Sequence, residues 1–133
     1  HVDPMGYVNF FKKTRLGGLI TQTRSEIFIL DSLPRFRFIQ TAAHELMHIW
    51  LFHHGQWDSD PALVEGSCNL AAYLVLSEYD DVEAQYCIKT LMDDDDPVYG
   101  DGFRTMKNYM DVVGVRKWLT YLKKHTILPY STR

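Results

Sequence analysis

The chain has 133 residues, a formal net charge of −3 and a hydrophobic fraction of 46%, which suit one globular domain and exclude general disorder. The acidic excess argues against an extended nucleic-acid face, and no apolar run is long enough to span a membrane. The two cysteines, Cys68 and Cys87, are too few for a disulfide framework and fit a reducing compartment, so we expect a cytoplasmic protein. We treat residues 1–133 as a single domain, in which residues 1–5 read as a vector remnant and are left out of the fold prediction.

The N-terminal part of the chain predicts a short helix and then a small β-sheet. Residues 7–16 are expected to form the helix, which the glycine pair at 17–18 would end. Residues 19–23 and 26–30 are rich in residues that favour strands and are separated by only two residues. We therefore expect these two segments to pair with each other across a tight turn.

The remainder of the chain predicts a run of helices. The longest covers about 35–54, where apolar residues recur at helical spacing without glycine or proline, and Gly55 follows as a stop signal. Asp60 can cap a second helix over about 61–79, which begins with proline. Further helices are expected over 80–92, 103–113 and 115–124. The predicted class is therefore α+β, with a small N-terminal sheet followed by a bundle of four to five helices.

The sharpest chemical signal is His44-Glu45-Leu46-Met47-His48, in the middle of the long predicted helix. Two histidines four residues apart lie on one helix face, where both can bind the same metal ion. Glu45 lies beside them and can serve as the general base for metal-bound water. The alternative is a structural helix that buries two histidines without a partner, which is costly. The motif therefore predicts one catalytic zinc ion at His44 and His48.

Two residues compete for the place of third ligand. His54 follows His48 by six residues, but Leu51 stands where the matching pattern has the glycine that lets the chain turn back. The helix should then continue and carry His54 away from the metal. Glu65 falls in the second turn of the next helix and faces the histidines if the two helices pack antiparallel. A surface glutamate favoured by the helix dipole is the alternative, but the histidine pair makes Glu65 the preferred ligand.

Two neighbours of Glu65 also bear on the site. Asn69 lies one turn further on, where it can accept a hydrogen bond from the far nitrogen of a ligand histidine and fix its tautomer. A polar surface stripe is the alternative. Cys68 is expected to be a small apolar contact between helices rather than a thiol switch or an inhibitory metal ligand. The tryptophans are expected in the core rather than in substrate stacking: Trp50, Trp57 and Trp118.

Peptide hydrolysis at zinc also needs a donor for the developing oxyanion, and three residues are candidates. Tyr99 lies in a glycine-rich stretch that could bring its hydroxyl over the metal, although packing on the core is the alternative. Arg104 could instead pair with Asp101, and His125 fits an exposed helix end. Asp101 is itself a candidate for hydrogen bonding to a ligand histidine.

Four blocks of the sequence resemble the peptidase domain of the plant DA1 family, which consists of LIM-domain regulators of organ size activated by ubiquitin and has bacterial relatives. The blocks are residues 29–36, 44–51, 64–69 and 97–104. The resemblance implies a zincin-like fold and a gluzincin-type zinc metallopeptidase that acts on a protein or peptide. Carried over by position, His44, His48 and Glu65 bind one zinc ion and Glu45 is the base.

The chain also departs from the plant pattern. Val64 stands where the plant relatives have an acidic residue, and these 133 residues contain no LIM domain and no ubiquitin-interacting segment. A link to ubiquitin therefore rests on the family resemblance alone. A compact bacterial relative fits these departures better than the plant protein.

These observations lead to one prediction with two rivals. We predict a zinc-dependent endopeptidase that hydrolyses peptide bonds through a metal-bound water activated by Glu45. One rival is a metal-binding regulatory or interaction module, whose structural site would need His54 or Cys68 as a fourth ligand and would have no use for Glu45. The other is a metal-dependent hydrolase of a non-peptide substrate.

Overall fold

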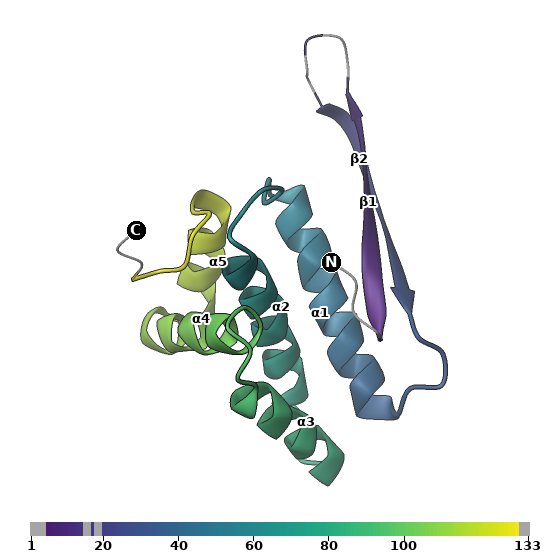
Figure 1. The fold of residues 1–133 in the computed structure, drawn as a ribbon, viewed down its shortest axis with the longest axis vertical. Helices are drawn as coiled ribbons and strands as arrows, with labels where there is room; N and C mark the ends of the chain where they lie inside the picture. The colour runs from purple at the N-terminus through teal and green to yellow at the C-terminus, as the bar shows by residue number, and fades with distance from the viewer. Residues whose placement is uncertain (1–4, 15–16, 18–19, 131–133) are drawn as a thin grey trace.

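The computed structural model describes residues 5–14, 17 and 20–130, and in this part of the chain a two-stranded antiparallel sheet precedes five helices (Figure 1). The elements are β1 (Gly6–Thr14), β2 (Ile20–Ile29), α1 (Arg35–His53), α2 (Pro61–Leu76), α3 (Val82–Asp93), α4 (Gly100–Val113) and α5 (Val115–Lys124). This arrangement confirms the predicted α+β class. Among these helices, none combines the length and apolar character needed to cross a bilayer. Most of the predicted vector remnant, residues 1–4, lies outside the described residues.

The predicted helix over 7–16 is wrong, because residues 7–14 belong to the strand β1, and residues 15 and 16 lie outside the described residues. Phe10 lies opposite Ser25 of β2 in the strand register, and its ring stacks on Phe52 of α1 with 4.2 Å between the ring centroids. Two residues on, the Lys12 ammonium lies 3.9 Å from the centre of the Trp57 ring. Alternate residues of β1 therefore contact the helical layer, which is the period of a strand and not of a helix.

The expected pairing of 19–23 with 26–30 is also wrong. Residues 20–23 and 26–29 fall in the single strand β2, which pairs along its length with β1. Gly17, with a φ of 95°, lies in the connection between the two strands, so it belongs to a hairpin rather than to the end of a helix. Residues 18 and 19 lie outside the described residues.

The helices α1 and α2 form the antiparallel helical hairpin that the sequence predicted (Figure 1). α1 ends at His53, and Gly55 follows in the left-handed conformation with a φ of 88°. The side chain of Asp60 accepts a hydrogen bond of 3.0 Å from the backbone N–H of Ala62, which caps the first turn of α2. α1 therefore lies between the β-hairpin on one side and α2 on the other.

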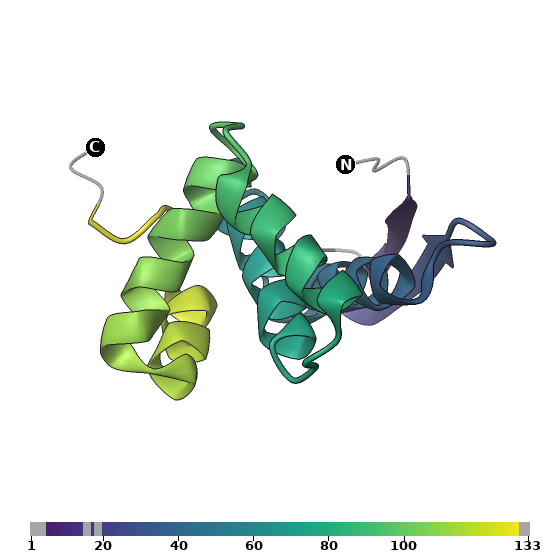
Figure 2. The same ribbon diagram turned by 90° about the horizontal axis from the view of Figure 1, so that it is seen from below.

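The core surrounds α2 and takes buried side chains from all five helices, with α1 on one side and α3, α4 and α5 on the other. Figure 2 shows the β-hairpin and the α4–α5 pair at opposite ends of the molecule, with α1 and α2 between them. The largest fully buried side chains are Trp118, Phe103, Leu51, Leu63 and Leu70. The prediction that the tryptophans lie in the core is confirmed for Trp118, which is buried. It is wrong for Trp57, which is 45% exposed.

The start of α4 meets α2 at backbone distance. A Cβ atom added to Gly66 would lie 2.3 Å from the carbonyl carbon of Gly102, and one added to Gly102 would lie 2.4 Å from the carbonyl oxygen of Ala62. Neither position can carry a side chain without moving a helix. α4 begins at Gly100 rather than at the predicted residue 103. The close contact between Gly102 of α4 and Gly66 of α2 fixes the turn of α2 that carries Glu65.

Replacing Gly66 with alanine should destabilise the fold, because the added methyl group would push α2 and α4 apart. We expect a loss of about 1–3 kcal/mol in the free energy of unfolding and a fall of several degrees in Tm, measured by circular dichroism. Val112→Ala, which shortens an exposed side chain on α4, is the control and should leave Tm within about 2 °C. An unchanged Tm in Gly66→Ala would show that the two helices are not in backbone contact.

Candidate metal centre

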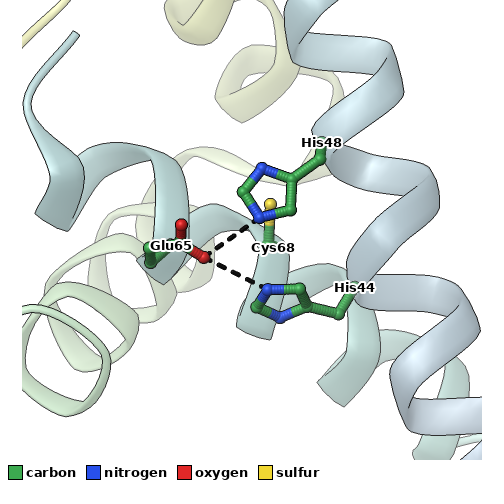
Figure 3. Close-up of side chains that lie close together, drawn as sticks. All are labelled: His44, His48, Glu65 and Cys68. Atoms are coloured by element: carbon green, nitrogen blue, oxygen red, sulfur yellow. Dashed lines mark hydrogen bonds and ion pairs between the residues drawn. The ribbon is translucent and has the colours of Figure 1, made fainter. Parts of the chain in front are cut away.

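His44 and His48 lie one turn apart on the face of α1 that packs against α2 (Figure 3). Both side chains are buried, and their ring centroids are 5.0 Å apart. The four-residue spacing within a continuous helix produces this arrangement directly. The predicted histidine pair therefore lies on one face and points into one space.

Glu65 completes the group from the second turn of α2, as its predicted position required. Its Oε1 atom lies 3.1 Å from the Nε2 atoms of both His44 and His48 (Figure 3). Ligand atoms held about 2.05 Å from a tetrahedral zinc ion are separated from one another by roughly 3.3 Å. Both distances from Glu65 to the histidines are thus close to the spacing around one small cation, and all the ligand atoms lie within 4.8 Å of one another, so the side chains present fit a metal ion.

A fourth donor lies in the same space. The sulfur of Cys68, one turn after Glu65, belongs to a buried group in which the ligand atoms of His44, His48, Glu65 and Cys68 all lie within 4.8 Å of one another. From the sequence Cys68 is expected to be an apolar contact between helices, and a metal ligand only in the rival structural site. Its three-residue offset from Glu65 was the available signal, because residues i and i+3 share a helix face.

The charges of this group depend on each other. Burial by itself would raise the pKa of Glu65, but the hydrogen bonds from His44 and His48 outweigh it and lower that pKa to about 2. Burial would likewise lower the pKa of His44, but the hydrogen bond and negative charge of Glu65 raise it above 6.5. Burial raises the pKa of the Cys68 thiol well above its usual value. The carboxylate therefore stays ionised and attracts positive charge, which a proton or a metal ion can supply.

Asn69 holds the first histidine in place. The His44 Nδ1–H group donates a hydrogen bond of 2.8 Å to Asn69 Oδ1, and both side chains are buried. With Nδ1 occupied in this way, Nε2 is the atom that faces Glu65 and a metal ion. This is the contact that the spacing of Asn69 after Glu65 predicted.

Glu45 lies beside the histidines but faces the β-hairpin. Its side chain is fully buried, and a Cβ atom added to Gly6 of β1 would lie 3.7 Å from Glu45 Cγ. The strand β1 therefore packs against the Glu45 side chain. The arrangement gives the site an acidic residue next to the metal-binding space and shields it from bulk solvent.

His54 does not join the donor group, in agreement with the sequence prediction. α1 continues through Leu51, and the His54 ring lies exposed beyond it, stacked on Trp50 with its Nδ1–H group donating to the Trp50 carbonyl. His125 is likewise an exposed residue at the end of α5, stacked on Tyr121.

The remaining predicted residues lie at the start of α4. The backbone N–H of Tyr99 donates to Asp96, and Tyr99 caps the helix. Asp101 is exposed and accepts a hydrogen bond from Arg104, so the first turn of α4 pairs these two with each other. This differs from the predicted contact of Asp101 with a ligand histidine, because in the structure Asn69 occupies Nδ1 of His44.

Comparison with known proteins gives a distant relationship to one group. The chain is 26% identical to Protein DA1-related 7 of Arabidopsis thaliana over 75% of its length, and 26% identical to Protein DA1 of the same plant over 73%. Protein DA1-related 6 is 28% identical over 60% of the chain. The chain spans only about a quarter of the length of the first two relatives. No family model and no solved structure matches the chain.

Metal content tests the ligand set directly. We expect the wild type to retain one metal ion per chain after zinc is added and the excess removed. With Cys68 outside the ligand set, Glu65→Ala should lose the metal because only two histidines remain to bind it. The measurement is elemental analysis of each purified protein, with circular dichroism to verify folding.

Two variants serve as controls for this measurement. His54→Ala and Cys68→Ala should both retain the metal ion if His44, His48 and Glu65 suffice to bind it. Loss of the metal in His54→Ala with retention in Glu65→Ala would show that the third ligand has been misassigned.

Proposed function

We propose that this chain is a zinc-dependent endopeptidase of the gluzincin type, with a zincin-like fold in which α1 is the active-site helix. The observation that carries the proposal is the convergence of His44, His48 and Glu65 on one buried space beside Glu45. The distant relationship to the DA1 proteins supports the same reading. The substrate class proposed is a protein or peptide.

Each residue has a separate task in this proposal. When bound by His44, His48 and Glu65, zinc supplies a Lewis acid that polarises a peptide carbonyl and lowers the pKa of a water molecule. The Glu45 carboxylate accepts the proton of the attacking water and passes it to the leaving amine. Asn69 keeps the His44 ring in the orientation that binding requires. The hydroxyl of Tyr99 is the proposed donor to the developing oxyanion.

Burial of Glu45 suits this role. A base shielded from bulk solvent exchanges its proton with the reacting groups rather than with free water. The cover provided by β1 is therefore part of the proposed mechanism as well as of the fold.

A second candidate function rests on Cys68. If its sulfur bound the metal together with the other three donors, the site would have four protein ligands, as structural zinc sites have. The chain would then be a metal-binding regulatory or interaction module without peptidase activity. The fully buried Glu45 beside the ligands favours the peptidase, since a structural site needs no base there.

Partners other than a substrate remain predictions. A link to ubiquitin follows from the family resemblance alone, and zinc is proposed from the donor set. These 133 residues align with about a quarter of the length of the first two plant relatives. Partners that bind the other three quarters of those proteins are therefore not carried over to this chain.

Cleavage of casein tests the proposed activity. We expect the zinc-loaded wild type to cleave casein, and Glu45→Gln to be slower by at least about 100-fold because the proton acceptor is lost. The reaction is followed by gel electrophoresis and mass spectrometry, with zinc content measured in parallel.

His54→Ala is the matched control, since it removes a nearby histidine outside the donor group, and it should cleave at the wild-type rate. Full activity in Glu45→Gln would exclude Glu45 as the base. A zinc-loaded wild type that cleaves nothing would favour the non-catalytic module.

A further inference from the structure

A pocket of about 350 Å³ opens beside the metal-binding group, and His48 and Glu65 form part of its wall. Its apolar walls come from Phe10, Leu51, Phe52, Trp57, Pro61 and Val64. These residues belong to the strand β1, the end of α1, the connection to α2 and the first turn of α2. The pocket thus lies where the β-hairpin meets the helical hairpin.

The aromatic walls are held in fixed positions. The rings of Phe10 and Phe52 stack with 4.2 Å between their centroids. The indole Nε1–H of Trp57 donates a hydrogen bond of 2.6 Å to the Phe52 carbonyl, and the Lys12 ammonium lies 3.9 Å from the centre of the same indole. A half-exposed tryptophan restrained in this way presents a ready surface to a ligand.

The polar groups of the pocket are already engaged within the protein. The amide nitrogen of Gln56 donates to the backbone carbonyls of Leu122 and His125, and its amide oxygen accepts from the Ser59 hydroxyl. The lining residues therefore offer few hydrogen-bonding atoms to a ligand apart from the metal-binding side chains. The aromatic and aliphatic walls therefore favour an apolar group on the ligand, while His48 and Glu65 provide polar atoms at the metal-binding side.

We propose that this pocket binds one large apolar side chain of the peptide substrate, with an aromatic ring preferred. The inference rests on the proposed function, because it places the peptide bond to be cut next to the metal. A side chain seated between Phe10 and Trp57 has its backbone within reach of His48 and Glu65, which line the same pocket. The volume suits one aromatic side chain and lies at the lower end of the range for ligand pockets.

Cleavage-site mapping tests this selectivity. Casein is digested with the zinc-loaded wild type, and the products are sequenced by mass spectrometry. We expect Phe, Tyr, Trp or Leu to be enriched at one fixed position relative to the cut bond. In Trp57→Ala the enrichment should fall by at least about fivefold because one wall is removed, and Trp57→Phe should restore most of it.

The matched control is Tyr86→Ala, which removes an exposed aromatic ring from α3, away from the pocket. It should retain the wild-type preference. Cleavage without any enrichment, or an enrichment that Trp57→Ala leaves unchanged, would overturn the inference while leaving the proposed peptidase in place.

A binding measurement keeps the inference testable if no cleavage occurs. Zinc-loaded Glu45→Gln is titrated with the acetylated pentapeptide amide Gly-Gly-Phe-Gly-Gly and with its copy carrying Ala for Phe, and isothermal titration calorimetry measures binding. We expect the Phe peptide to bind at least about tenfold more tightly, and Trp57→Ala to abolish the difference. Equal binding would overturn the pocket. Selective binding without casein cleavage would instead retain the pocket and reject the peptidase.

Discussion

The buried carboxylate of Glu65 between His44 and His48 is the interaction on which the rest of the structure depends. An ionised group this deeply buried is unfavourable unless hydrogen bonds satisfy it, and the two Nε2 atoms lie at hydrogen-bond distance, 3.1 Å, from its Oε1 atom. Those contacts require α1 and α2 to run antiparallel at close range. The backbone contact between Gly66 and Gly102 holds the same turn of α2 from its other side. The donor group is thus fixed by packing from both directions.

α1 is the element that connects the proposed chemistry with the proposed recognition. Its ligand face points to α2, whereas Glu45 faces the strand β1, and the end of the helix contributes Phe52 to the apolar pocket. The same strand that covers Glu45 also supplies Phe10 to that pocket. A two-stranded hairpin is only marginally stable by itself, so its contact with α1 both stabilises it and completes the site.

The helices and the convergence of the histidine pair could be predicted because their signals are local. Gly55 and the Asp60 cap mark the ends of α1 and α2, and the spacing of the two histidines places them on one helix face. The strand β1 could not be predicted in the same way, because its pairing with β2 is a long-range contact and Phe10-Phe11-Lys12-Lys13 hides the alternation. The approach of Cys68 to the donors and the exposure of Trp57 depend on how the elements pack, which a single sequence does not specify.

X-ray absorption at the zinc edge of the zinc-loaded protein tests the central claim, an open site made by His44, His48 and Glu65. The predicted spectrum contains only nitrogen and oxygen neighbours at about 2.0–2.1 Å, with the outer-shell pattern of two imidazole rings. A sulfur neighbour at about 2.3 Å would show that Cys68 closes the site, and the absence of the two-imidazole pattern would show that the zinc is bound elsewhere. Either result would contradict the assignment of this centre as catalytic.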